Sequence, residues 1–347
     1  MNRVSRIHTD FNELTRILLY KREHESMWLL ATISSYFINA GVYVADKFLL
    51  SKKIHSSITY AFYVGIWSIF NIFLLVFDPW LPDLRELLVD LLAGFLFLIT
   101  LIFWYKALHQ SEATRVVPIV GALTPIFSFL FSYIFLQESL GERQLLAFVI
   151  LINGGILISV KYTRFWMLKD VWRRFRSLFG DILGPIHARY RPTRRLIINS
   201  TASAILFATY YVLIKYIYSE QPFIGGFVWS RMGTFIGVML ILFVGDWRKL
   251  IIKHQKGAKS PKNLAFFLLV RILAAIAFIM LNWAISLGNV ALINSLLGTQ
   301  YVFLFFIVLF LSAKYPQILK EELGGGVMLQ KIIGVSLIVT GLYMLVT

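Results

Sequence analysis

The sequence predicts an all-α integral membrane protein with ten transmembrane helices, arranged as two inverted five-helix repeats. Ten apolar runs approach or exceed the ~20 residues that a helix needs to cross a bilayer core. They lie at residues 27–50, 58–77, 87–109, 113–136, 144–160, 196–218, 223–244, 264–287, 289–312 and 328–346. Because each group of five holds an odd number of spans, the second group must enter the membrane upside down, as in the inverted repeats of secondary transporters.

Composition excludes most other classes of protein. Hydrophobic residues make up 58% of the chain and charged residues 15%, whereas an ordinary soluble domain carries about 25% charged residues. The apolar runs are too long for barrel strands, and in lipid the backbone must satisfy its own polar groups, so the spans are helices. The chain has no cysteine, which excludes disulfides and thiol chemistry. We expect no cofactor and no metal site.

The chain divides into four parts around these spans. They are a polar N-terminal tail at 1–26, the first repeat at 27–160, a basic amphipathic linker at 161–195 and the second repeat at 196–347. Residues recur between the repeats, since Ala107 and Gly121 align with Ala284 and Gly298 at a constant offset of 177. The helix count and the five-plus-five division are the firmer support for the repeat.

The net charge of +16 reflects 34 lysines and arginines against 18 acidic residues. Basic residues gather in loops beside the spans, where they set topology and meet anionic lipid, so we expect no nucleic-acid partner. The odd-numbered loops carry 24 of them, and the two termini with the even-numbered loops carry 8. Cytoplasmic loops are enriched in lysine and arginine, so this distribution favours both termini outside the cytoplasm.

The linker contains one amphipathic segment, residues 164–186. Apolar residues at 168, 171, 172, 175, 178, 179 and 182 follow the helical spacing, with Lys169, Arg173, Arg174 and Arg176 among them. We expect a helix that lies on an anionic lipid surface. A docking helix for a partner protein is the alternative.

The third to fifth spans carry a recognisable pattern. It consists of Tyr105-Lys-Ala-Leu108, Glu112-Ala113, Val117-Pro118, Leu123-Thr-Pro-Ile-Phe127, Phe135-Leu-Gln-Glu138, Gln144 and Asn153-Gly-Gly-Ile-Leu157. This pattern resembles the EamA-type repeat of the drug/metabolite transporter superfamily, and the resemblance covers most of residues 27–346. In the second copy Val302 replaces the proline that Pro125 predicts, and residues are inserted around 315–326. The resemblance implies a transporter with both termini in the cytoplasm, opposite to the charge distribution.

The first and sixth helices hold matching polar residues. Asn39, Tyr43 and Lys47 share one helix face, and Tyr43 and Lys47 align with Tyr211 and Lys215 at an offset of 168. The family resemblance implies that these two helices are symmetric gates beside a central cavity. We expect Asn39, Tyr43 and Tyr211 to contact substrate. The lysines guard the ends of the pathway, or alternatively sit at helix ends and snorkel.

The fourth helix holds two prolines, Pro118 and Pro125, which are expected to kink it and to act as hinges. Kinks of this kind are also common structural features without a role in gating. The prolines are therefore gating candidates beside Lys47 and Lys215.

Two arginines lie deep in the spans, where a purely structural role is harder to justify than for the lysines at helix ends. Arg231 and Arg271 lie seven or eight residues inside their spans, or about 10–12 Å at the helical rise. A cation at that depth is costly unless it is paired or hydrated. We expect Arg231 to face the cavity, and if both arginines are hydrated and unpaired, an anionic substrate is favoured. The further candidates for substrate binding are Trp104, Tyr105, Asn282, Trp283, Asn294, Gln300 and Tyr301.

These features favour a secondary transporter that moves a small metabolite, anionic or amphiphilic, by alternating access. The alternative is a flippase for a lipid-linked or phosphorylated amphiphile. A non-transporting scaffold is a third possibility, and the scattered histidines do not indicate an enzyme. No carboxylate is placed convincingly mid-span, which disfavours proton antiport and leaves facilitated diffusion or exchange open. We expect a monomer or homodimer in the plasma (inner) membrane of a prokaryote. The substrate, the direction of transport and the coupling ion are left open.

Overall fold

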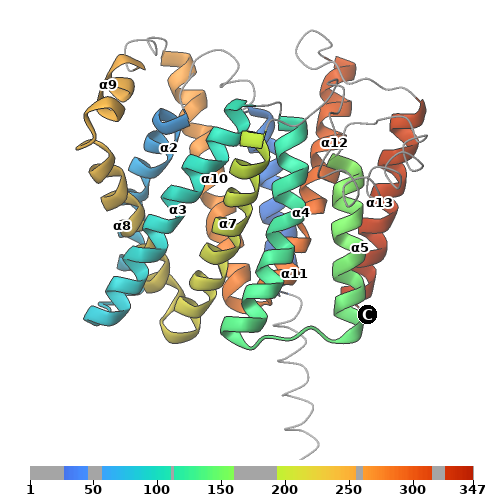
Figure 1. Cartoon of the computed structure of the whole chain (residues 1–347), viewed down its shortest axis with the longest axis horizontal. Helices are drawn as coiled ribbons and strands as arrows, with labels where there is room; N and C mark the ends of the chain where they lie inside the picture. Colours follow the sequence, from blue (N-terminus) through green and yellow to red (C-terminus); the bar gives the residue numbers. More distant parts are fainter. Residues whose placement is uncertain are drawn as a thin grey trace, which may run out of the picture.

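The computed structural model describes residues 27–45, 57–110, 113–159, 194–254, 261–314 and 325–346, and every element within these ranges is a helix. The first repeat contains the first span Met27–Ala45, α2 Ser57–Ile66, the 3₁₀-helix η1 Trp67–Val76, α3 Leu84–Gln110, α4 Ala113–Phe131, the π-helix η2 Ser132–Leu136 and α5 Glu142–Ser159. The second contains α7 Arg194–Glu220, α8 Phe223–Ile241, α9 Gly245–His254, α10 Pro261–Leu287, α11 Val290–Ser295, α12 Leu297–Lys314 and α13 Gly325–Val346. The all-α prediction is confirmed (Figure 1).

Among the described residues, nine helices are long and apolar enough to cross a membrane. They coincide with nine of the ten predicted spans, so the chain is an integral, multi-pass membrane protein. The tenth prediction, at 58–77, corresponds to a shorter apolar helix, Ala61–Val76, which is α-helical only to Ile66. There the side-chain amide of Asn71 donates to the carbonyl of Ser68, three residues back, which suits the tighter winding of η1.

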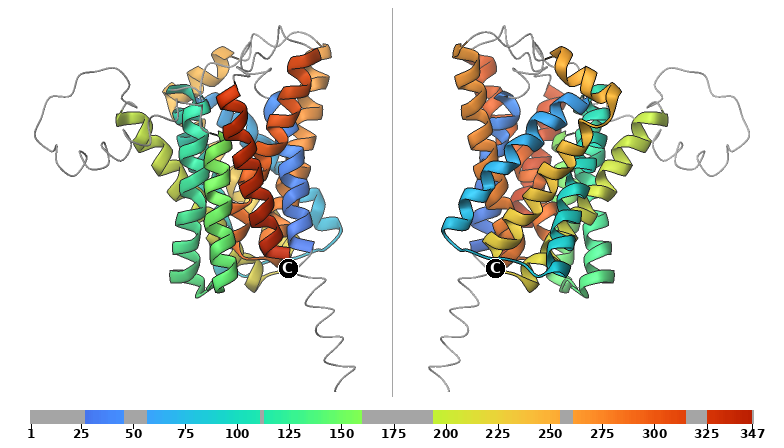
Figure 2. Two further views of the ribbon diagram at one scale, coloured as in Figure 1. Left: turned by 90° about the vertical axis from the view of Figure 1, so that its right-hand side faces the viewer. Right: turned by 90° about the vertical axis from the view of Figure 1, so that its left-hand side faces the viewer.

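The last helices of the two predicted repeats, α5 and α13, pack directly against each other. Figure 2 shows α4, α5 and α13 side by side, and α5 contacts α13 along its length. A Cβ at Gly154 would lie 2.8 Å from Ile338, and a Cβ at Gly334 would lie 2.6 Å from Ile158. At an offset of 180 residues Gly154 corresponds to Gly334 and Ile158 to Ile338. Each contact is therefore the counterpart of the other, as expected between elements related by a two-fold axis.

Glycines also bring α3 and α8 into close contact. A Cβ at Gly94 would fall on the backbone of Ser230, and one at Gly233 would fall on the backbone of Leu91. The hydroxyl of Thr234 donates to the carbonyl of Gly94 at 3.0 Å. Small residues permit such backbone contact between membrane helices, and this contact fixes the height of α8 relative to α3.

Several predictions concern parts of the chain outside the described residues. They are the N-terminal tail at 1–26, the amphipathic segment at 164–186 with the rest of the linker to residue 193, and Lys47. One short helix was not predicted, α9, which lies between α8 and α10 at the end of the bundle opposite the C-terminus (Figure 1).

Candidate functional site

Arg231 lies at the centre of the bundle, as the ninth residue of α8. It stands about 12 Å along the helix axis from Phe223, where α8 begins, and its side chain is only 4% exposed. One guanidinium nitrogen, Nη2, donates to the hydroxyl of Tyr210 at 2.8 Å, whereas Nε has no hydrogen-bond partner. Within the described part of the chain no carboxylate pairs with this arginine.

Aromatic rings take the place of a counter-ion around Arg231. The guanidinium carbon lies 4.3 Å from the ring centre of Phe97 and 4.7 Å from that of Phe278, with Tyr210 and Phe227 at 5.6 and 5.9 Å. A cation at a span centre costs about 2.5–3.5 kcal/mol on insertion scales, and one desolvated cation–π contact supplies about 2 kcal/mol. The two nearest rings are therefore sufficient to hold the charge in place.

The arginine belongs to a network of polar side chains from α7, α8 and α10. Asn282 of α10 is fully buried, and its Oδ1 accepts from the hydroxyl of Tyr218 at 3.0 Å and from that of Tyr210 at 3.5 Å. Its Nδ2 donates to the carbonyl of Phe278 one turn earlier. The network thus places donors and an acceptor around one buried positive charge, and we call Arg231, Tyr210, Tyr218 and Asn282 the arginine cluster.

Tyrosines connect this cluster to the first span and α12. Tyr211, beside Tyr210 on α7, lies near Tyr36 of the first span. Tyr36 also lies near Tyr301, and Tyr301 near Tyr43. The hydroxyl of Tyr36 donates to the carbonyl of Ile293 at 3.0 Å. Residues predicted on three different helices are therefore brought together along the interior of the bundle.

The span Val290–Leu311 is interrupted near these tyrosines. It consists of α11 and α12, which meet at Leu296. Just before the interruption, Nδ2 of the buried Asn294 donates to the hydroxyl of Ser128 on α4 at 2.8 Å. Asn294 is one of the predicted substrate-binding residues, and in this structure it connects α11 to α4.

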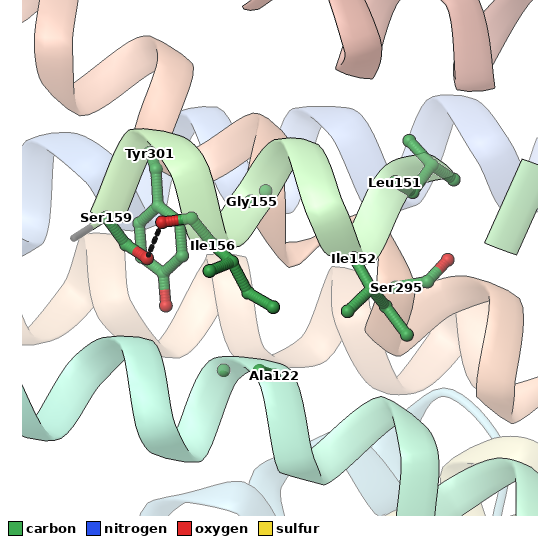
Figure 3. A pocket seen from close by; sticks show the side chains of 10 residues that line it. Ala122, Leu151, Ile152, Gly155, Ile156, Ser159, Ser295 and Tyr301 are labelled. Atoms are coloured by element: carbon green, nitrogen blue, oxygen red, sulfur yellow. Dashed lines mark hydrogen bonds between the residues drawn. The ribbon is translucent and has the colours of Figure 1, made fainter. Parts of the chain in front are cut away.

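A small cleft lies beside the interruption, between α4, α5, α11 and α12. Figure 3 shows Tyr301 and Ser159 at one end and Ser295 toward the other. The close approach of Gly155 to Gly298 forms part of its wall. The cleft has room for little more than one water molecule. It is too small for a metabolite in this conformation.

Side chains also meet where η2 ends and α11 begins. Nδ2 of Asn289 donates to Oε2 of Glu138 at 2.8 Å, and Nζ of Lys215 donates to the carbonyl of Ser286 at 3.1 Å. Lys215 also attracts Glu138 electrostatically, but burial is the largest influence on that carboxyl group and raises its pKa. Glu138, Asn289, Lys215 and Ser286 form what we call the end contact, which joins the two repeats.

The other predicted residues lie apart from the arginine cluster. Trp104 packs edge-on against Phe207, 6.1 Å between ring centres. Asn39 contacts Ser35 on its own helix at 3.4 Å. Trp283 is 38% exposed, on the outward face of α10 that also carries the exposed Ile272 and Ile276. Tyr105 and Gln300 are half-buried. The prolines lie within α4, which is one continuous α-helix past both Pro118 and the buried Pro125.

The prediction overlooked one buried carboxylate, Asp90. It is the seventh residue of α3 and has no exposed surface. Its Oδ1 accepts from Nε2 of Gln221 at 3.2 Å, and its Oδ2 has no partner among the described residues. The signal in the sequence was an acidic residue inside a predicted span. The expectation concerned carboxylates at mid-span, whereas Asp90 lies in the second turn of α3, near one end of its span.

Comparison with known proteins supports the fold. It also supports the predicted family resemblance over residues 26–160. Residues 26–160 match the EamA-like transporter family, which is the family that the sequence motifs indicated. A solved crystal structure, described only as that of a protein, has a TM-score of 0.60 with 14% identity. The alignment covers 92% of this chain and 97% of the other. At that identity the likeness shows the fold alone. No curated protein matches the chain.

Proposed function

We propose that this chain carries a small organic anion by alternating access. Residues 26–160 match the EamA-like transporter family, a family of membrane transporters of small molecules. The observation that carries the proposal is Arg231. It is buried at mid-span, it has no carboxylate partner among the described residues, and its Nε makes no hydrogen bond. Charged side chains at this depth are retained where they meet a substrate or an ion.

The chemistry of the arginine cluster fits a carboxylate or phosphate. A guanidinium presents several donors in one plane and binds such groups through two parallel hydrogen bonds. Tyr210 accepts a hydrogen bond from one edge of the guanidinium, and the aromatic rings stabilise its positive charge when no anion is present. An arriving anion would replace the rings as the partner of Arg231, which requires α8 or α10 to move away from α3.

Transport by reconstituted protein tests the proposal. We would measure uptake of succinate, glutamate, glucose 6-phosphate, glucose and choline into liposomes, for the wild type and for Arg231→Gln. Loss of a hydrogen bond to a charged group costs about 1.5–3 kcal/mol, so we expect saturable uptake of at least one anion and a decrease of about ten- to a hundred-fold in the variant. The matched control is Arg248→Gln, an exposed arginine of α9, which should transport as the wild type does.

Two results would overturn the proposal. Uptake of choline but of no anion would make Arg231 structural. Translocation of a fluorescent phospholipid in the same liposomes, without uptake of the soluble anions and lost in Arg231→Gln, would identify a flippase instead. In that case the arginine would recognise a lipid phosphate, with the same hydrogen-bonding chemistry.

A further inference from the structure

Asp90 and Gln221 share one hydrogen bond, but each also has a buried oxygen that lacks a hydrogen-bond donor. Nε2 of Gln221 donates to Oδ1 of Asp90 at 3.2 Å. On the other side of that bond, Oδ2 of Asp90 and Oε1 of Gln221 are both buried without a hydrogen-bond partner among the described residues. An unpartnered buried acceptor costs about 1–3 kcal/mol, so two of them side by side are unfavourable when Asp90 is ionised.

A single proton on Asp90 would remove both defects. A carboxylic acid and a primary amide can form a cyclic pair, in which the amide N–H donates to one carboxyl oxygen and the acid O–H donates to the amide oxygen. The amide half of this arrangement is present already. We propose that Asp90 carries a proton in this conformation, that Oδ2–H donates to Oε1 of Gln221, and that this pair is the proton site of a proton–anion symporter.

Few charged groups surround the site. On its own helix Glu86 lies one turn earlier, where it forms reciprocal hydrogen bonds with Asp83. From α7, Tyr218 lies near both Asp90 and Arg231. Arg231 is the only charged residue of α8. The sequence of α2 holds no charged residue, and the only one in α4, Arg115, is at the opposite end of the bundle from the start of α3. Within the described residues no cation pairs with Asp90.

The position of Gln221 links the proton to conformation. Asp90 belongs to the first repeat, whereas Gln221 lies in the turn between α7 and α8 of the second. When the repeats separate at this turn, Asp90 loses its amide partner, meets water and releases its proton. An anion at Arg231 adds negative charge near Tyr218, which opposes the ionisation of Asp90. The proton and the anion therefore bind together. This coupling rests on the proposed function, whereas the protonation of Asp90 in this conformation does not.

Infrared spectroscopy of the purified protein tests the proton site without any substrate. We expect the wild type at neutral pH to show the carbonyl stretch of a protonated carboxylic acid, absent in Asp90→Asn and retained in Asp246→Asn, which removes an exposed carboxylate of α9. The side-chain amide introduced by Asp90→Asn would keep both hydrogen bonds of the protonated pair, so this variant should fold and should be as thermally stable as the wild type. Absence of the band in the wild type, its retention in Asp90→Asn, or failure of that variant to fold would each overturn the proposal.

Proton movement tests the coupling separately. Liposomes containing a pH-sensitive dye are mixed with succinate, glutamate or glucose 6-phosphate. We expect an anion carried by the wild type to acidify the lumen, and Asp90→Asn to exchange that anion across the membrane without acidification. Acidification by Asp90→Asn would overturn the coupling. If the infrared band is present and no anion is carried, the proposed function fails while the proton site stands.

Discussion

Glu138, like Asp90, is an acidic side chain through which the first repeat contacts the second. Its Oε2 accepts from Asn289, and the backbone N–H of Val290 also donates to the carboxyl group. Asn289 in turn caps α11, since its Oδ1 accepts from the N–H groups of Ala291 and Leu292. Burial outweighs these donors and Lys215, and it raises the pKa of Glu138 above its ordinary value of 4.5.

The raised pKa predicts how stability depends on pH. Above pH 4.5 the unfolded chain has lost the proton of Glu138 while the folded protein still holds it, so this group makes the folded state less stable as pH rises through that window. We expect the melting temperature of Glu138→Gln to rise relative to that of the wild type as pH increases from 4.5 toward neutrality. The control, Glu142→Gln, removes an exposed carboxylate from the first turn of α5. Parallel pH profiles for wild type and Glu138→Gln would contradict the prediction.

The residues of the arginine cluster were predictable to different degrees. Arg231 and Asn282 stand out in the sequence because each is a polar residue inside an apolar run. Tyr210 does not, because it is one of two adjacent tyrosines and only the packing of α7 decides which of them meets the arginine. Trp283 follows Asn282 directly and faces outward, since successive residues of a helix point about 100° apart.

Among the elements, α3 and α8 depend most on their glycines. The backbones of Gly94 and Gly233 approach the facing helix so closely that no side chain fits between them. Phe97 and Arg231 lie on the same two helices, one turn or less from these glycines. The spacing of the two helices therefore sets the distance between the guanidinium of Arg231 and the ring of Phe97.

Substituting one of these glycines should separate the two helices. A Cβ in Gly94→Ala would fall on the backbone of Ser230 and Thr234, which cannot move aside as a side chain can, so we expect a loss of about 1–3 kcal/mol of stability. Gly41→Ala is the matched control, because nothing lies within 4 Å of its Cβ. It should be neutral or stabilising by up to about 1 kcal/mol. Melting temperatures in detergent check both, and equal values for the two variants would refute the packing argument.

Helix positions were largely predictable, and helix interruptions were not. The long spans follow from apolar length, which the bilayer imposes whatever the neighbours are. The change to 3₁₀ winding after Ile66 and the break at Leu296 leave little trace in hydrophobicity. The 3₁₀ segment contains the local hydrogen bond of Asn71 with Ser68. The break at Leu296 follows the contact of Asn294 with Ser128 of α4, which forms only when the helices are packed.

At the scale of the whole molecule, the two repeats meet in contacts of different kinds. The contact between α5 and α13 is formed by closely approaching glycines and by a hydrogen bond from Nε2 of Gln330 to the carbonyl of Leu157 at 2.7 Å. The end contact of Glu138 with Asn289 and the pair of Asp90 with Gln221 consist of hydrogen bonds, which water can replace when the repeats separate. Alternating access by relative movement of the repeats would therefore break the two side-chain pairs and keep the closely packed contact between α5 and α13.

A cross-link at the end contact tests this division. The chain has no cysteine, so Glu138→Cys with Asn289→Cys can be joined by a short thiol-specific reagent without side reactions. We expect the joined protein to lose anion uptake in liposomes, because the end contact can no longer open, and cleavage of a reducible linker to restore it. Each single variant treated with the same reagent should transport as it does untreated. Full activity of the joined protein would mean that this end stays closed throughout the cycle and that substrate enters and leaves elsewhere.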